Sequence, residues 1–204
     1  HITTAISNLL LLSNYSSNNS KENVFETNKK YGNFLKKSSE NIYSKKLIKK
    51  KSKNQKINVG FVSADLHQHS VTYFLEPLLK NYNKDEFVIT CFSASFHNDH
   101  VTKKIKSSVD KWFNVEPLSD IQLCNLIKQN DIEILIDLSG HTEGNRLPVF
   151  AMKPSPIQIS WLGYPNTTGL YAMDYRIVDN FTDPEGIDDH LYTEELLSLD
   201  GSFI

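Results

Sequence analysis

The sequence predicts an α/β protein in which a mostly parallel β-sheet is flanked by helices and preceded by a short helical segment. Two observations lead to this prediction. From about residue 56 onward, short apolar runs rich in β-branched residues alternate with stretches whose apolar residues recur at helical spacing. The 204 residues, of which 39% are hydrophobic, are enough to bury a core, and the near-average composition excludes disordered, collagen-like and disulfide-scaffold proteins.

Residues 1–44 are predicted to form a helical junction, and residues 45–56 a linker. An amphipathic helix is expected to end near residue 14, and a second helix to run from Glu22 to about Lys36, although Gly32 weakens it. The linker holds seven Lys and no aromatic residue, which is typical of a solvated segment rather than a nucleic-acid or membrane patch.

Residues 57–204 are predicted to form a Rossmann-like domain. Strands are predicted at residues 57–62, 87–92, 132–138, 156–161 and 175–178, the last of the series. Helices are predicted at residues 71–82, 101–109, 120–127 and 146–152. Pro77 lies inside the first helix, which should be kinked there or begin late, and Asp120 should cap the third. Because strands that alternate with helices form βαβ units with right-handed crossovers, the sheet should be mostly parallel.

Charge and cysteine content narrow the range of functions. Residues 1–56 carry 12 Lys against 3 Glu, whereas residues 57–204 carry 10 basic and 21 acidic residues. The acidic domain argues against a nucleic-acid-binding surface, and the lack of a run of about 18 apolar residues argues against a membrane span. Cys91 and Cys124 lie in apolar contexts without a CxxC pair, which indicates buried, reduced thiols in a cytoplasmic protein.

Polar loops follow three of the predicted strands, at residues 63–70, 139–146 and 163–169. In an open parallel sheet, ligands bind beyond the carboxyl ends of the strands. We therefore expect His69, His141 and Thr167 to lie along one edge of the sheet. The Gly, His, Asn and Thr content of these loops suits a pocket for a sugar or a phosphate.

Each loop also has a purely structural interpretation. Gly140 and Gly144 suit tight turns, residues 164–169 are themselves typical of a turn, and Ser70 is a candidate helix cap. The glycine spacing lacks the third glycine of the dinucleotide fingerprint, and no P-loop motif occurs. Binding of NAD or of a nucleotide by a P-loop is therefore disfavoured.

The histidines leave a metal site open only as a minor alternative. His67, His69 and His141 could form a three-histidine site, and His97 and His100 have the spacing of a helical metal pair. The intervening Asn and Asp favour a loop at that pair, and the sequence has no D-x-D motif. No metal site is predicted.

Several motifs, taken together, resemble those of a known family. They are Ile57–Asp65, His69, Tyr73–Leu79, Ile134–Thr142, Gly144–Leu147, Phe150–Pro154, Gln158, Trp161–Gly169 and Met173–Tyr175. The chain from about residue 56 to 200 resembles the first catalytic lobe of the O-GlcNAc transferase/SPINDLY-like family, glycosyltransferase family 41, especially its bacterial members. The Trp-Leu-Gly-Tyr-Pro run followed by Met-Asp-Tyr is highly specific. Residues 1–40 resemble the helical junction that follows tetratricopeptide repeats in that family.

The resemblance implies a two-lobed, inverting glycosyltransferase of the GT-B type that needs no metal and no cofactor. Such enzymes transfer N-acetylglucosamine from UDP-GlcNAc to Ser or Thr hydroxyls of proteins. The implied partners are protein acceptors and a nucleotide sugar, with tetratricopeptide repeats upstream in the same chain and no nucleic acid or membrane.

The resemblance also assigns roles to residues of the polar loops. The family histidine that is a proposed general base falls on His69, although Ser70 stands where the family has proline. A neutral imidazole can take a proton near pH 7, which fits that role. Substrate binding is predicted for residues of the two later loops, namely His141, Thr142, Gly163, Tyr164, Pro165, Thr167 and Thr168.

The family's second lobe, which supplies most nucleotide contacts and largely selects the donor, is not within these residues. Transfer of fucose from GDP-fucose, glucosylation of Asn, and a truncated, non-catalytic binding or scaffold module therefore stay open as alternatives. By itself, the chain is expected to fold at least partly and to transfer no sugar. A parent reading frame that continues for about one further domain would favour the enzyme over the scaffold module.

Overall fold

The computed structural model describes residues 2–39 and 55–203. Within these ranges the chain forms one seven-stranded, entirely parallel sheet with the order β3-β2-β1-β4-β5-β6-β7. The strands are β1 (Ile57–Ser63), β2 (Phe87–Ser93), β3 (Lys111–Asn114), β4 (Ile134–Asp137), β5 (Ile157–Ser160), β6 (Tyr175–Asp179) and β7 (Glu195–Leu199). The helices are α1 (Ile2–Ser13), α2 (Lys21–Ser39), α3 (Ser70–Asn81), α4 (His100–Ser108), α5 (Asp120–Gln129) and α6 (Leu147–Ala151), with a 3-10 helix, η1 (Asp189–Leu191).

The direction in which strands are added reverses beside β1. From β1 the chain builds outward through β2 to β3, then returns to the other side of β1 with β4 and continues to β7. The register pairs Gly60 with Thr90 on β2 and with Leu135 on β4. Such a reversal opens a crevice at the carboxyl ends of the two central strands, which is where ligands bind in doubly wound sheets.

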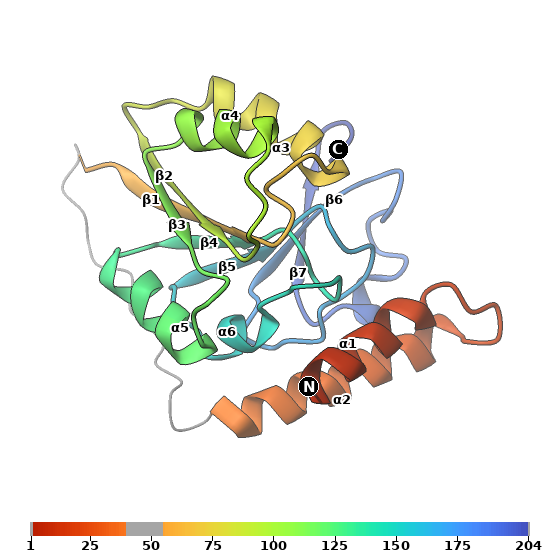
Figure 1. The fold of residues 1–204 in the computed structure, drawn as a ribbon. Helices are drawn as coiled ribbons and strands as arrows, with labels where there is room; N and C mark the ends of the chain where they lie inside the picture. Colours follow the sequence, from red (N-terminus) through yellow and green to blue (C-terminus); the bar gives the residue numbers. More distant parts are fainter. Residues whose placement is uncertain (1, 40–54, 204) are drawn as a thin grey trace.

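Helices cover both faces of the sheet (Figure 1). On one face, α3 and α4 bury Leu75, Leu79 and Ile105 against β1 and β2. On the other face, α5 and α6 lie against the sheet, and α1 and α2 pack beyond them (Figure 1). Buried strands of this kind consist of nearly continuous apolar residues, which is why the central strands were recognisable from sequence.

The two N-terminal helices share the hydrophobic core of the sheet. Leu10 of α1 is fully buried, and Tyr31 and Leu35 of α2 are each 3% exposed, in the same cluster as Leu123 and Phe150. The described part of the predicted helical junction is therefore packed onto the domain. Of the predicted Lys-rich linker, residues 45–54 lie outside the described residues.

Two edge strands differ from the sequence prediction. Strand β3 was not predicted, and residues 175–178 were wrongly taken as the last strand, because β7 follows them. Both strands lie at the edges of the sheet and contain no fully buried residue, with a Lys at the start of one and a Glu at the start of the other. Edge strands lack the continuous apolar run that burial on both faces imposes, so their sequence signal is weak.

The structure excludes one of two alternatives for α3 and corrects the predicted cap of α5. Helix α3 begins at Ser70 and continues through Pro77, so it does not start late. The residue that caps α5 is Ser119 rather than Asp120, because the Ser119 hydroxyl and the Gln122 side chain form a reciprocal capping box. Cys91 and Cys124 are both buried and unbonded, as predicted.

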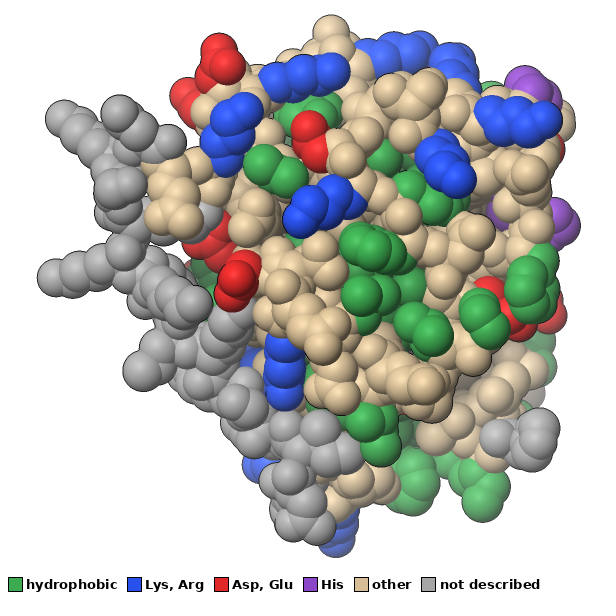
Figure 2. Space-filling model, turned by 60° about the vertical axis from the view of Figure 1, so that its left-hand side comes forward, with side chains coloured by type: hydrophobic (Ala, Val, Ile, Leu, Met, Phe, Trp, Pro, Cys, Tyr) green, Lys and Arg blue, Asp and Glu red, His purple; other side chains and the backbone are tan. Residues whose placement is uncertain are grey.

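On the face shown in Figure 2, basic side chains are interspersed with apolar and acidic ones and do not gather into one patch. Among the helices that the structure describes, none is long and apolar enough to cross a membrane.

Gly32 sits where α2 touches the loop that follows β5. It is buried, and a methyl carbon added there would lie 1.7 Å from the carbonyl oxygen of Gly169. Helix propensity alone predicts that Gly32→Ala stabilises α2 by about 1 kcal/mol. The contact predicts the opposite sign, because the helix and the loop backbone would have to separate.

We expect Gly32→Ala to lower the free energy of unfolding by about 1–3 kcal/mol, the usual range for overpacking. The neighbouring Asn33→Ala is the matched control, because Asn33 is exposed on the same helix and should become slightly more stable. Urea denaturation followed by circular dichroism measures both changes. A Gly32→Ala protein as stable as the wild type would show that this contact does not hold α2 in place.

Candidate active site

A cavity of about 730 Å³ opens at the carboxyl ends of the strands, across the point where the strand order reverses. Its wall comes from the loops after five strands, β1 to β5. The lining residues are Ala64, Asp65, His67, His69, Ala94, Ser95, Phe96, His97, Glu116, Thr142, Glu143, Gly144 and Gly163. Of the predicted site residues, His69, Thr142 and Gly163 thus line one cavity.

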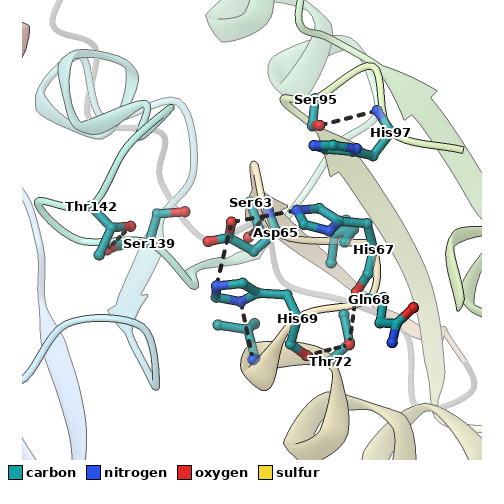
Figure 3. Close-up of polar contacts among 12 residues, drawn as sticks. Ser63, Asp65, His67, Gln68, His69, Thr72, Ser95, His97, Ser139 and Thr142 are labelled. Carbon is teal, nitrogen blue, oxygen red and sulfur yellow. Dashed lines mark hydrogen bonds and ion pairs between the residues drawn. The ribbon is translucent and has the colours of Figure 1, made fainter. Parts of the chain in front are cut away.

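The loop after β1 places a carboxylate between two imidazoles. Asp65 Oδ1 lies 3.8 Å from His67 Nε2 and 4.0 Å from His69 Nε2 (Figure 3). These distances are in the range of ion pairs and longer than hydrogen bonds. In Figure 3 both rings point toward the same carboxylate from the side of α3 and β2. The group combines proton donors and a proton acceptor at the cavity wall.

His69 is fixed by the start of α3. It is the N-cap residue, and its Nδ1 accepts a hydrogen bond from the backbone N–H of Val71 at 3.3 Å. The Thr72 hydroxyl donates to the carbonyl oxygens of His67, at 2.9 Å, and of His69, at 2.7 Å. His69, rather than Ser70, therefore caps this helix, and the cap bond fixes which nitrogen faces the cavity.

Burial changes the acid–base properties of this group. Desolvation raises the pKa of Asp65 above its ordinary value, against the opposing effect of His69 and His67, while nearby Glu143 raises it further. Desolvation also lowers the pKa of His67, and so does His97, whose ring centroid lies 4.1 Å from that of His67. The environment thus raises the basicity of the Asp65 carboxylate and favours the neutral form of His67.

Thr142 and Gly163 form the opposite side of the cavity. The Thr142 hydroxyl donates to the carbonyl oxygen of Ser139 at 2.8 Å, which closes the turn after β4. A side chain at Gly163 would place its first carbon 1.9 Å from the carbonyl oxygen of Leu138, so only glycine allows the two loops to approach this closely.

His141 lies behind the cavity wall, not on it. Its side chain is fully buried: Nε2 donates to the carbonyl oxygen of Thr168 at 2.9 Å, and Nδ1 accepts from the Ser7 hydroxyl at 3.0 Å. The rings of Tyr31 and Tyr164 meet it edge-on, with centroids 5.2 and 5.0 Å away. Burial lowers the pKa of His141 to about 4, so it is a neutral residue that joins four segments.

The remaining residues predicted to bind substrate also have internal partners or lie away from the cavity. Thr167 and Thr168 are fully buried, and both donate hydrogen bonds to the carboxylate of Glu194. The Thr167 hydroxyl donates at 2.5 Å, and the Thr168 backbone N–H donates at 2.8 Å. Tyr164 is buried, and its hydroxyl accepts from Asn14 at 2.9 Å. Pro165 is exposed and does not line the cavity.

The sequence analysis missed part of the cavity wall. Asp65 was recognised only within a motif and its polar loop, His97 was considered only as part of a metal pair with His100, and Phe96 was not considered. The same rule that selected the other loops would have found Asp65 and His97, because polar residues directly follow a predicted strand in each case. Glu116 follows β3, a strand that the sequence did not reveal.

The described residues do not assemble a metal centre. In residues 2–39 and 55–203, no group of three or more His, Cys, Asp or Glu side chains is arranged to hold a metal ion. The histidine cluster instead gathers around one carboxylate, with contacts of ion-pair length.

A doubly wound parallel sheet with a polar cavity at its reversal point defines the class of α/β ligand-binding domains. The family model for glycosyl transferase family 41 matches residues 32–204, and the chain belongs to that family.

Named relatives and a solved structure agree with that assignment. The Petunia hybrida "Probable UDP-N-acetylglucosamine--peptide N-acetylglucosaminyltransferase SPINDLY" is 32% identical over 204 residues, which are 97% of this chain and 21% of the relative. The Oryza sativa protein of the same name is 36% identical over 150 residues, 72% of this chain and 16% of the relative. A mutant O-GlcNAc transferase from Thermobaculum terrenum has a TM-score of 0.91 and 31% identity, over 98% of this chain and 38% of its own. The chain thus spans about a fifth of the length of the curated relatives.

We expect the pH dependence of stability to reveal the buried neutral state of His141. Its pKa is about 4 in the folded protein and 6.5 when unfolded, so the unfolded state binds the extra proton between these values. The stability that neutral His141 confers is therefore complete above pH 6.5 and is lost as the pH falls toward 4, at about 1.4 kcal/mol per pH unit.

The measurement compares wild type with His141→Asn by urea denaturation at pH 7.5 and pH 5. The difference in unfolding free energy should be larger at pH 7.5 and should shrink at pH 5. Asp137, whose pKa burial raises to about 6, has the opposite pH dependence but is present in both proteins, so it cancels. A difference that grew on acidification would mean that His141 is charged when folded.

Proposed function

We propose that this chain forms the first lobe of a glycosyltransferase that transfers N-acetylglucosamine from UDP-GlcNAc to Ser or Thr hydroxyls of proteins. The observation that carries the proposal is the cavity at the sheet's reversal point, with Asp65, His67 and His69 on its wall, in a chain of glycosyl transferase family 41. The relatives named above as peptide N-acetylglucosaminyltransferases supply the donor and the class of acceptor.

The charge of the cavity favours the acceptor over the diphosphate part of the donor. Its wall includes three carboxylate residues, Asp65, Glu116 and Glu143. Carboxylates repel a diphosphate but can accept hydrogen bonds from the hydroxyls of a Ser or Thr side chain or of a sugar. We therefore place the acceptor hydroxyl and the transferred sugar here, with the nucleotide held largely by the second lobe.

The chemistry that this lobe must supply is the removal of a proton. An alcohol is a poor nucleophile, so a positioned base has to accept its proton as the bond to the anomeric carbon forms, an effect worth about 10²–10⁴-fold in rate. The resemblance assigns this task to His69, which faces the cavity beside Asp65. Thr142 and Gly163 line the cavity, which supports the proposal that they contact substrate, whereas His141, Tyr164, Thr167 and Thr168 are buried and hold the loops in position.

The resemblance further supports proposals about the whole protein. We propose that transfer needs no metal ion or other cofactor, that the protein acts in the cytoplasm, and that tetratricopeptide repeats upstream of this chain select the acceptor proteins. Pro165, which is exposed, remains a candidate for contact with such an acceptor.

The test uses the full-length protein with an acceptor protein and, in separate reactions, UDP-GlcNAc, GDP-fucose and UDP-glucose. Intact-mass spectrometry should show a mass increase equal to N-acetylhexosamine, and only with UDP-GlcNAc. EDTA should leave the rate unchanged. Transfer of a deoxyhexose from GDP-fucose would replace the donor that we propose, and no transfer from any donor would favour a non-catalytic module.

We expect Ser95→Trp to lower kcat/KM by about 10²-fold, because an indole in the cavity would displace the acceptor from its reactive position. Ser95 lines the cavity, and Ser107→Trp is the matched control, because Ser107 is exposed on α4 away from it. Initial rates under wild-type conditions measure both variants. Equal rates for the two would place the reaction outside this cavity.

A further inference from the structure

We propose that Asp65 accepts the proton of the acceptor hydroxyl and that His69 donates a hydrogen bond to this carboxylate. The inference rests on the function proposed above and names the residue that performs its proton transfer. The two nitrogens of His69 face different partners: Nδ1 faces the backbone N–H of Val71, and Nε2 faces Asp65 (Figure 3).

The cap of α3 determines where the proton of neutral His69 resides. Nδ1 accepts the backbone N–H of Val71 at 3.3 Å, so Nδ1 carries a lone pair and the ring proton lies on Nε2. The other tautomer would direct an Nδ1–H at the Val71 N–H and a lone pair on Nε2 at Asp65 Oδ1, 4.0 Å away. Both contacts would be repulsive, so the local structure favours the Nε2–H tautomer.

A ring in that tautomer is a poor acceptor at the cavity. Its Nε2 already holds a proton, and its only lone pair is used at Nδ1 by the helix cap. Protonation at Nδ1 would break the cap bond, and an N-cap bond is worth about 0.5–2 kcal/mol. His69 in this arrangement is therefore a donor toward Asp65.

Asp65 has the properties that a base at this position needs. It lies two residues past the end of β1 and lines the cavity, yet its side chain is only 18% exposed. His67 and His69 both approach Oδ1, so the second oxygen, Oδ2, is the one that a hydroxyl in the cavity would meet. The distances of 3.8 and 4.0 Å from Oδ1 to the two histidines are longer than hydrogen bonds. Catalytic hydrogen bonds are often long in a free enzyme and shorten when substrate is bound.

The groups around Asp65 tune its basicity in opposite directions. His67 and His69 from its own loop, and His97 from the loop after β2, lower its pKa, whereas burial and Glu143 from the loop after β4 raise it, with burial the largest effect. A raised pKa makes this carboxylate a stronger base than an exposed aspartate near neutral pH.

In the proposed step one bond forms, one bond breaks and one proton is transferred. The acceptor oxygen forms a bond to the anomeric carbon of the nucleotide sugar, and the bond from that carbon to the diphosphate oxygen breaks. The electron pair of the broken bond leaves with the nucleoside diphosphate. The hydroxyl proton passes to Asp65 Oδ2, and the resulting carboxylic acid later releases it to solvent through the open cavity.

The first test does not depend on activity. Long-range ¹H–¹⁵N spectra of the chain at pH 7.5, assigned by the loss of signals in His69→Asn, report the tautomer of His69. We expect the Nε2–H form, and a ¹³C titration of the Asp65 carboxyl should give a pKa above 3.8, its ordinary value. An Nδ1–H tautomer would overturn the proposal whatever the protein catalyses.

The second test compares Asp65→Asn with His69→Asn in the full-length protein. Asparagine at position 65 keeps the shape but accepts no proton, so kcat should fall by about 10²–10⁴-fold with a much smaller change in KM. Asparagine at position 69 can still cap α3, so kcat should fall by only about tenfold, through loss of the bond that orients Asp65. Thermal unfolding confirms that both variants fold.

The outcomes separate this inference from the function on which it rests. If His69→Asn loses as much activity as Asp65→Asn or more, His69 is the base and the inference fails while the proposed function stands. If the wild type transfers sugar from no donor, the proposed function fails and the base assignment fails with it, whereas the spectra still report the tautomer.

Discussion

The imidazole of His141 is the contact on which the arrangement of the cavity depends. It bonds to Ser7 of α1 and to the backbone after β5, and its ring lies between Tyr31 of α2 and Tyr164. One side chain thus ties the two N-terminal helices to the loops that follow β4 and β5. A buried polar group that loses its partner costs about 1–3 kcal/mol, so these segments are held in one arrangement together.

Two buried charged residues extend this support along the loop after β5. The guanidinium of Arg176, at the start of β6, donates to the carbonyl oxygens of Tyr164 and Asn166, both at 2.9 Å. Glu194, just before β7, accepts from Thr167 and Thr168. The loop therefore has little freedom, and Gly163 presents a fixed surface to the cavity.

The two sides of the cavity consequently differ in character. The supporting side, around His141 and Glu194, is made of short hydrogen bonds between groups that are shielded from solvent. On the other side, Asp65 and its two histidines are 3.8–4.0 Å apart and open to the cavity. A rigid support beside a looser titratable group suits catalysis, because the support positions the substrate while the titratable contacts shorten on binding.

The sequence by itself determined the central strands, the order of helices and the edge of the sheet at which His69, Thr142 and Gly163 meet. Burial on both faces imposes continuous apolar runs, and the parallel βαβ pattern then places the following loops together. Strands β3 and β7 were not predicted from the sequence, because edge strands carry no such continuous apolar run. Only the tertiary structure decided that His141 is a buried link and that the loops after β2 and β3 complete the cavity beside Asp65 and His69. Ser7 is 134 residues from His141 in the chain, whereas the orientation of the His69 ring is set locally, because its Nδ1 accepts the N–H of Val71 two residues further on. A residue type shows which bonds a side chain can make, whereas its role depends on the groups that the fold brings within reach.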